Sequence, residues 1–196
     1  MTTLATTGEG NTPLSPEELA GLIPNLATKE ELNEWERQNI LLAREWALAD
    51  RTDPTVRVSD QYIRKLHLKM FEATWKWAGQ YRGIEKNSGV PAHEIRERLV
   101  ALLGDALFWI KYKTYSADEI TVRFHHRLVF IHPFANGNGR HARLFADRLV
   151  AKLGRPTFTW GSASLVGEGQ ARNRYLEALR AADEGHLKPL LDFARS

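Results

Sequence analysis

The sequence predicts an all-α protein. Three stretches place a serine or threonine three residues before a glutamate: SPEE from Ser15, TKEE from Thr28 and SADE from Ser116. This arrangement is a capping box, in which the two side chains bond the free N–H groups at a helix start. After the second and third boxes, apolar residues recur with a broadly helical spacing. Helices are therefore expected to make up most of the chain.

Further signals place the remaining elements. Ser59 can cap a helix, Gly79 is typical of a helix end, and Asp53-Pro54 is expected to break the helix that starts at Thr28. The polar, glycine-rich stretch GQYRGIEKNSGV at 79–90 is expected to form a short β-hairpin. The expected helices begin at Ser15 and Pro91, span 28–50, 59–79, 117–131 and 140–153, and end with a pair over about 170–182 and 187–194.

The composition is that of an ordinary globular domain. Of 196 residues, 43% are hydrophobic, which is enough for one well-filled core. The 27 basic and 24 acidic residues are interspersed, so nucleic acid is not expected as a partner. The absence of cysteine excludes disulfides and thiolate metal sites. No apolar run is long enough for a membrane span. We expect a cytoplasmic protein whose residues 1–12 are disordered.

One stretch, HPFANGNGRHAR at 132–143, combines features that suit a phosphate ligand. The loop at 136–139 (NGNG) leads into a predicted helix, so backbone N–H groups and the positive end of the helix dipole meet in one concavity. Arg140 and Arg143 are three residues apart, which puts both guanidinium groups on one helix face. The pattern predicts binding of a molecule with more than one phosphate.

His132 precedes this loop and is suited to proton transfer. Pro133 disfavours the helical conformation for the residue before it, so His132 is expected at a helix end. Its ordinary pKa makes it a proton acceptor near neutral pH. The stretch thus offers a base, an anion cradle and two cations, which suit attack by a hydroxyl on phosphorus. A purely structural helix connection would explain the glycines and the proline, but not two arginines beside a histidine.

Residues 132–143 resemble the signature of the Fic (Fido) family, H-P-F-x-D/E-G-N-G-R-x-x-R. The resemblance extends to FHHRLVFIHPF, WAGQYR and RNRYLEALRAADEGHLKPLLDFA, and the whole chain, including ELNEWERQNIL, further resembles the subgroup called mobile mystery protein B. It implies an all-α, Fic-type helical bundle with a short β-hairpin flap near the active site. The Fic domain would span 59–196, after an N-terminal helical region at 13–58.

The family resemblance implies transfer of AMP from ATP, with Mg²⁺, to a Ser, Thr or Tyr hydroxyl of a target protein. His132 would be the general base, and Phe134 would anchor the loop. The flap residues Tyr81, Arg82, Gly83 and Ile84 would pair with the target's backbone. The nucleotide-binding residues would be Gly137, Asn138 and Gly139 for the α-phosphate, Arg140 and Arg143 for the β- and γ-phosphates, and Asn173 and Tyr175 for the base.

One position departs from the signature. Asn136 stands where the family has the acidic residue that holds Mg²⁺. An amide oxygen can still bind Mg²⁺, but it lacks the negative charge that this hard cation prefers. Two functions therefore stay open. One is a protein adenylyltransferase, with nucleotidyl or phosphoryl transfer to another acceptor as a close variant. The other is a nucleotide-binding module, weak or inactive in catalysis, that acts in regulation or partner binding.

The resemblance also raises self-inhibition, in which a helix with the pattern S/T-x-x-x-E-G/N pairs its glutamate with the second arginine. SLVGEG at 164–169 fits the letters, but its glycines disfavour a helix. The helix at 28–50 is the better candidate, with Glu34 or Glu36 facing Arg143, although both glutamates would also suit a solvated face. A separate antitoxin chain and a homo-oligomer stay open as partners.

Overall fold

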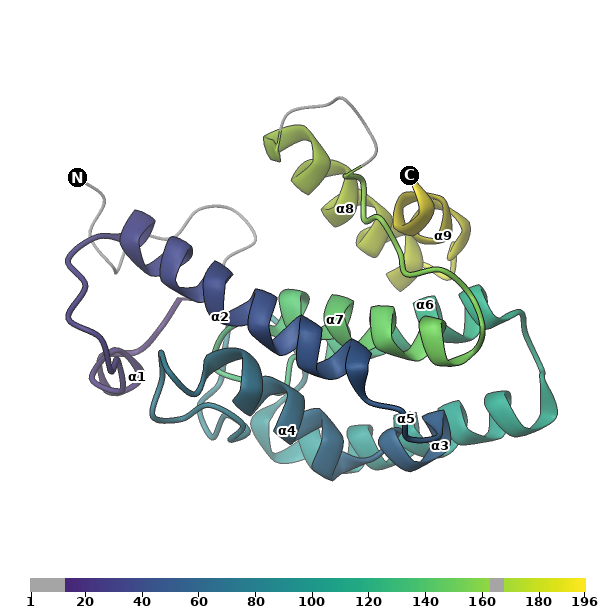
Figure 1. Ribbon diagram of the computed structural model, residues 1–196, viewed down its shortest axis with the longest axis horizontal. Coiled ribbons are helices and arrows are strands. Elements are labelled where there is room, and N and C mark those ends of the chain that lie inside the picture. The colour runs from purple at the N-terminus through teal and green to yellow at the C-terminus, as the bar shows by residue number, and fades with distance from the viewer. Residues whose placement is uncertain (1–12, 163–167) are drawn as a thin grey trace.

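The computed structural model describes residues 13–162 and 168–196, and within these ranges the protein is helical (Figure 1). No strand occurs there, and two isolated bridges join Leu22 to Trp75 and Tyr81 to Phe134. No described helix is both long and apolar enough to cross a membrane. The helices are α1 (Pro16–Leu19), α2 (Lys29–Ala49), α3 (Pro54–Arg57), α4 (Asp60–Phe71), the 3₁₀ helix η1 (Ala92–Glu94), α5 (Ile95–Tyr112), α6 (Ala117–Ile131), α7 (Asn138–Lys152), α8 (Glu168–Asp183) and α9 (Lys188–Arg195).

The predicted helix starts are confirmed, because each predicted capping side chain bonds the expected backbone N–H group. The side chains of Ser15, Thr28, Ser59 and Ser116 all accept from the N–H three residues later. The first two also form the full capping box, in which the glutamate side chain returns to the cap's own N–H. These bonds fix where α1, α2, α4 and α6 begin.

Replacing Ser59 with alanine is expected to lower the free energy of unfolding by about 1 kcal/mol, the usual value of a helix cap. The hydroxyl oxygen of Ser59 accepts from the N–H of Tyr62, 3.3 Å away, and alanine cannot replace that bond. Urea denaturation measures the change. Ser88→Ala, at an exposed position without a helix to cap, is the control and should stay within about 0.5 kcal/mol of wild type. Equal losses in both variants would contradict the role of the cap.

Helix α7 occupies the centre of the molecule, between two apolar clusters. The larger cluster joins buried side chains of α2, α4, α5, α6 and one side of α7. The smaller joins the other side of α7 to α8, α9 and Phe158. Figure 1 shows α2 and α8 on either side of the space above α7. A helix packed into both clusters is held firmly, which suits an element whose first turn follows the loop at 136–139.

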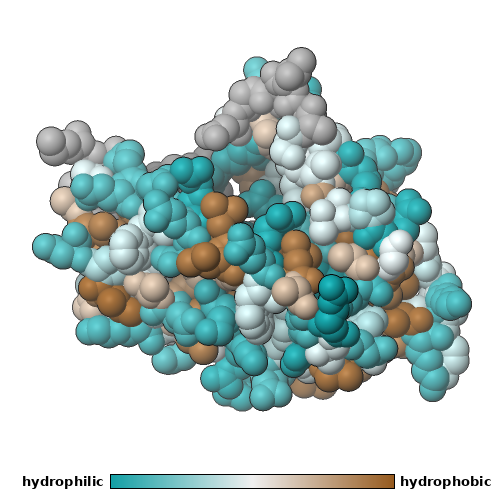
Figure 2. All heavy atoms as spheres, in the orientation of Figure 1, coloured by the Kyte–Doolittle hydropathy of each residue, from teal (hydrophilic) through white to brown (hydrophobic). Residues whose placement is uncertain are grey.

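The surface carries no single large apolar area on the face that Figure 2 shows, where hydrophobic residues form small groups among hydrophilic ones. The exposed apolar side chains include Leu41 and Leu42 on α2 and Phe108 and Tyr112 on α5. Scattered apolar residues of this kind are normal on a protein surface.

The helix predicted over 59–79 ends early, at Phe71. Beyond it the chain makes successive turns, with the N–H groups of Thr74 and Trp75 both bonded to the carbonyl of Phe71. The residues before α2 account for this ending: the N–H of Ile23 donates to Thr74, and the carbonyl of Gly21 accepts from Lys76. These contacts between distant segments outweigh the local preference for helix. Gly79, with a φ of 75°, closes the turns rather than the helix.

Two smaller differences concern helix starts. Asp53-Pro54, expected only to break the preceding helix, begins the short helix α3, because the Asp53 carboxylate caps the N–H of Thr55 at 2.8 Å. Helices α7 and α8 begin at Asn138 and Glu168, each two residues earlier than predicted. The expectation of disorder at 1–12 and most of SLVGEG at 164–169 lie outside the described residues.

The β-hairpin expected at 79–90 is not present. The two ends of this segment bond to the chain around the motif instead of to each other: the N–H of Arg82 donates to the Pro133 carbonyl at 2.9 Å, and the N–H of Val90 donates to the Ile131 carbonyl at 3.4 Å. The backbone groups that would form a hairpin ladder are thus already used. We call residues 81–90 the flap segment.

Candidate active site

His132 ends helix α6 and adopts a left-handed backbone conformation, with φ 54° and ψ 58°. Its N–H still donates to the carbonyl of Leu128, 3.2 Å away, so the ring stands at the last turn of the helix, as the proline after it predicted. Burial, and next the charge of Arg82, lower the pKa of His132 to about 4, against a hydrogen bond with the Val129 backbone that raises it. The imidazole is therefore neutral at pH 7 and can accept a proton.

The loop after His132 is braced from within. Both polar atoms of the Asn138 side chain bond the backbone of Phe134, at 2.9 Å and 2.8 Å. Phe134 is fully buried, as expected for an anchor. Gly137 has a φ of 77°, and a Cβ there would lie 2.5 Å from the ring of Phe71, so only glycine fits. The side chain of Asn138 thus holds the loop in shape, which leaves backbone N–H groups as the loop's donors.

His67, on α4, is a supporting residue that the sequence analysis missed. Its Nδ1 accepts from the N–H of Gly79 at 3.0 Å, so Nε2 carries the proton and donates to the carbonyl of Asn136 at 3.1 Å. Its ring stacks on Phe134, with centroids 3.7 Å apart. Burial lowers the pKa of His67 far below its usual value, which keeps the ring neutral. The available signal was its spacing four residues from both Ile63 and Phe71, on the apolar face of the helix.

The first turn of α7 is open to an anion. Its N-cap is Gly137, which has no side chain to bond the first N–H groups. A Cβ at Gly139 would meet only the Tyr175 hydroxyl within 4 Å, at 3.8 Å, so the backbone here can be approached closely. Unpaired N–H groups at a helix start favour a phosphate oxygen. The backbone here leaves room for the phosphate that the glycines predicted, and phosphate binding stays a prediction.

The two arginines of the motif have different surroundings. Arg140 Nη1 lies 2.6 Å from Glu36 Oε2, across from α2, and Glu36 Oε1 accepts from Trp75 Nε1 at 2.7 Å. Glu36 is almost fully buried. Arg143 lies over the ring of Tyr175, with its guanidinium carbon 5.2 Å from the centroid, and makes no ion pair with any carboxylate of the described residues. The glutamate of α2 therefore holds the first arginine, whereas the sequence suggested the second.

Glu34, the other glutamate suggested by the sequence, points away from the site. It is exposed and pairs with Arg37, one turn along the same helix, at 2.7 Å. Glu34 therefore lies on a solvated helix face, and of the two glutamates only Glu36 contacts the motif. The two glutamates differ by two positions, which is more than half a helical turn.

The two residues suggested for contact with the adenine base differ in solvent exposure. Tyr175 is buried, and its hydroxyl lies 3.2 Å from Nε2 of His125. Burial raises the pKa of Tyr175 to about 12, so the ring carries no charge. Asn173 is exposed on α8. Of the pair, Tyr175 lies beside the loop, at Gly139 and Arg143.

Three further histidines make structural contacts near the site. His125 is buried and its Nε2 lies 3.2 Å from the Tyr175 hydroxyl, and His126 bonds Asp183 at 2.8 Å. His141, inside the motif, is fully buried and bonds the carbonyl of Ile63 at 2.9 Å.

Residues 57–150 match the model of the Fic/DOC family. These residues form a Fic domain. A protein adenylyltransferase Fic from Nematostella vectensis is 30% identical over 119 residues, which cover 59% of this chain and 26% of that protein. One from Drosophila yakuba is 38% identical over 69 residues, or 35% of this chain and 12% of that protein. The chain thus spans about a quarter or less of the curated relatives it matches.

Solved structures share the fold. BepC from Bartonella tribocorum, with bound AMPPNP, has a TM-score of 0.69 at 18% identity and covers 92% of this chain and 97% of that one. The N-terminal Fic domain of a cell filamentation protein from Bartonella quintana, with bound ADP, has a TM-score of 0.67 at 20% identity, over 91% and 94% of the two chains. At these identities the likeness establishes the helical fold.

Where the Fic signature has an acidic residue, this domain has Asn136, which offers Mg²⁺ one neutral oxygen. The side-chain oxygen of Asn136 already accepts from the N–H of Gly137 at 2.5 Å. No cluster of three or more His, Cys, Asp or Glu suited to a metal occurs among the described residues. Bound phosphates would therefore have to supply most of the ligands of a metal ion here.

The flap segment of the Fic domain divides into an exposed tip and buried ends. Gly83 and Ile84 are exposed, whereas Arg82 and Val90 are buried. Tyr81 is half-buried, and its hydroxyl donates to Asp60 at 2.7 Å. Of the four residues suggested for target contact, two are thus accessible, and the side chain of Arg82 is turned inward.

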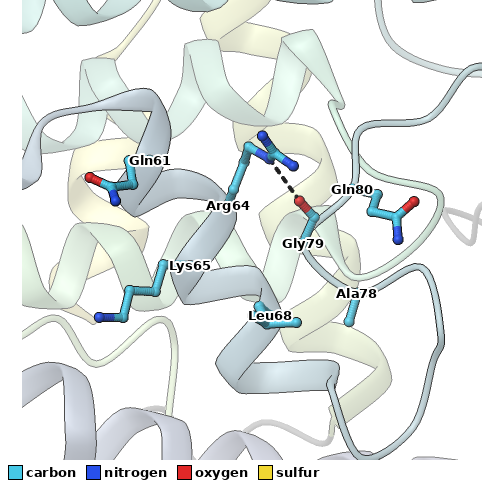
Figure 3. Close-up of a pocket in the computed structure, with 7 residues that line it drawn as sticks. All are labelled: Gln61, Arg64, Lys65, Leu68, Ala78, Gly79 and Gln80. Carbon is cyan, nitrogen blue, oxygen red and sulfur yellow. Dashed lines mark hydrogen bonds between the residues drawn. The ribbon is translucent and has the colours of Figure 1, made fainter.

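A pocket of about 210 Å³ lies just before the flap segment, between α4 and residues 78–80 (Figure 3). Arg64 crosses it and donates to the Gly79 carbonyl at 3.0 Å. No residue of the motif lines this pocket, so it is separate from the loop at 136–139.

Proposed function

We propose that the protein is an adenylyltransferase that moves AMP from ATP to a Ser, Thr or Tyr hydroxyl of a target protein. The observation that carries this proposal is the succession of His132, a neutral imidazole at the end of α6, and the uncapped first turn of α7 with its two arginines. The name of the curated relatives, protein adenylyltransferase Fic, supports the same reaction.

In the proposed reaction, His132 takes the proton of the target hydroxyl as its oxygen attacks the α-phosphorus of ATP. The new oxygen–phosphorus bond forms, the bond to the bridging oxygen breaks, and pyrophosphate leaves. The N–H groups of Asn138 and Gly139 stabilise the charge that develops on the α-phosphate, and the N–H of Gly137 joins them when the Asn136 side chain releases it to bind Mg²⁺. Arg140 and Arg143 hold the departing phosphates, which positions the reacting atoms. Tyr175 and Asn173 are proposed to contact the adenine base.

Mg²⁺ is the proposed metal, with Asn136 as its protein ligand; when bound, it supplies positive charge to the phosphates. Asn136→Asp adds the missing charge and is expected to lower the Mg²⁺ concentration for half-maximal transfer by about tenfold, roughly the gain from one charge-assisted contact. A titration of transfer rate against Mg²⁺ measures this. Asn33→Asp, an exposed site on α2, is the control and should leave the titration unchanged. An unchanged curve in Asn136→Asp would contradict the assignment.

Labelled ATP tests the proposed function. With label on the α-phosphate, the protein is expected to label a target in lysate or itself, and with label on the γ-phosphate it is not. Label from the γ-phosphate would instead show phosphoryl transfer. The alternative is a nucleotide-binding module, which the presence of Asn136 in place of an acidic residue supports. Nucleotide binding without transfer, even in the Asn136→Asp, Glu36→Gln double variant, would favour it.

We also propose that Glu36 restrains the enzyme by holding Arg140 away from phosphate, since the two side chains lie 2.6 Å apart. The exposed tip of the flap segment, Gly83 and Ile84, is proposed to align the target as an added extended strand. The domain boundaries, 13–58 and 59–196, and membership of the mobile mystery protein B subgroup rest on the sequence resemblance. An antitoxin chain or a second copy are further candidate partners.

A further inference from the structure

We propose that Arg82 is a positioning residue that fixes the backbone of His132 and fastens both ends of the flap segment to it. This inference rests on the proposed function, because it assigns the residue that sets up the base and the target-aligning segment together. The sequence resemblance placed Arg82 among residues that face the target. The structure instead turns its side chain into the protein, where none of it is exposed.

The contacts of Arg82 join three stretches of backbone. Its Nε donates to the carbonyl of His132 at 2.8 Å, and Nη1 donates to the carbonyl of Ile84 at 3.1 Å. Its Nη2 donates to the carbonyl of Val90. The guanidinium of Arg82, at the start of the flap segment, therefore bonds Ile84, Val90 at the segment's end, and the peptide group of His132. Lysine has no planar fork of donors and cannot make all three bonds.

The conformation of His132 explains why such a bond is needed. A positive φ at a residue other than glycine costs about 1 kcal/mol or more and persists only when the surroundings impose it. The bond from Arg82 fixes the peptide plane that follows His132. Gly89 packs on the other side, where a Cβ would lie 2.4 Å from the Cβ of His132 and 2.9 Å from Nη2 of Arg82. The flap segment is thus packed closely against His132 at Gly89.

The charge of Arg82 adds a second effect. The cations that act on His132 are Arg82 and Lys86, both in the flap segment, and both lower its pKa. Lys86 is itself paired with Glu18 of α1. Among the described residues, the only carboxylate paired with Arg82 is the exposed Glu85, 3.8 Å away, and the charge of Glu18 acts on it from farther off. Carbonyl oxygens at close range therefore compensate most of the buried charge. Arg82 therefore helps to keep the base unprotonated.

Two variants separate the bonds from the charge. Arg82→Lys keeps the charge, so the pKa of His132 should stay near its wild-type value, while kcat falls by about 10–100-fold because the base is misplaced. The KM for the target should rise as the ends of the flap segment loosen. Arg82→Gln also removes the charge and should raise the pKa of His132 by about one pH unit. In both, nucleotide Kd should stay within about twofold of wild type, because Arg82 makes no contact with the phosphate loop.

The measurements are AMP transfer at several pH values, nucleotide binding by calorimetry, and an NMR titration of ¹⁵N-labelled histidines in which His132→Ala assigns the signal. Arg98→Gln is the control, since Arg98 is an exposed arginine paired with Glu94 on one helix, and it should change none of these values. Wild-type kcat and KM in Arg82→Lys would overturn the inference. So would a loss of nucleotide affinity as large as the loss of transfer, because that indicates general unfolding.

Two further measurements test the inference if Arg82→Gln does not fold or if the wild-type protein shows no AMP transfer. If Arg82→Gln does not fold, Gly89→Ala replaces it: the added methyl presses on His132 and should lower kcat without changing nucleotide Kd, and wild-type kcat there would overturn the inference. If the wild-type protein transfers no AMP, that result contradicts the proposed function but not the inference about Arg82. An unchanged pKa of His132 in a folded Arg82→Gln would then overturn the inference by itself.

Discussion

Replacing His132 with alanine is expected to lower AMP transfer by about 10²–10⁴-fold, the usual contribution of a general base. His132 is the proposed base, its lowered pKa keeps the imidazole neutral at pH 7, and alanine leaves no group to take the proton of the target hydroxyl. Nucleotide Kd should change little, because the loop N–H groups and both arginines remain. The initial rate of label transfer from α-labelled ATP measures the effect.

The pH dependence of AMP transfer by the wild-type protein also follows from the role proposed for His132. Because the pKa of His132 is lowered to about 4, the base is unprotonated at neutral pH. Transfer should therefore vary little between about pH 6 and 8 and fall as the pH drops below about 5. His126→Ala is the matched control: His126 lies on the same helix but bonds Asp183, away from the loop. Undiminished transfer in His132→Ala would rule out His132 as the base.

Replacing Glu36 with glutamine is expected to raise AMP transfer and to tighten nucleotide binding, each by about tenfold or more. A hydrogen bond to a charged group is worth about 1.5–3 kcal/mol, and this one competes with phosphate for Arg140. Glutamine keeps an oxygen for Trp75 Nε1, so the packing between α2 and the turns after α4 should survive. Calorimetry gives the nucleotide Kd, and the labelling assay gives the rate.

Glu34→Gln is the matched control for Glu36→Gln. Both positions lie on α2 and lose the same charge, but Glu34 pairs with the exposed Arg37 and has no contact with the motif. Its rate and nucleotide Kd should equal those of wild type. If the two variants behave alike, the pair between Glu36 and Arg140 does not restrain the enzyme.

Local sequence features were sufficient for the helix starts and for the backbone of the loop at 136–139. A cap is a bond between a side chain and a backbone group three residues away, so Ser15, Thr28, Ser59 and Ser116 identify it without any tertiary context. The same holds for the loop at 136–139 and for His132 at a helix end, where glycine and proline set the backbone directly. The position of the candidate site was therefore readable from the sequence.

The ends of α4 and the form of the flap segment depended on distant contacts. Local preference favoured a helix to Gly79 and a hairpin after it. Backbone groups of residues 21–23 bond the chain after α4 instead, and the ends of the flap segment bond residues 131 and 133. Each backbone N–H and carbonyl has only a few partners, so these bonds displaced the local alternatives.

The sequence by itself determined an all-helical chain with a histidine at a helix end, a glycine loop and two arginines in one stretch, because each depends on residues within one or two helical turns. Only the tertiary structure decided that Glu36 reaches Arg140 and Glu34 does not, that His67 carries the loop, and that Arg82 faces inward to hold His132. The physical reason is that these contacts join residues 50 to 104 positions apart. Their formation depends on how helices pack around α7, which no local pattern encodes.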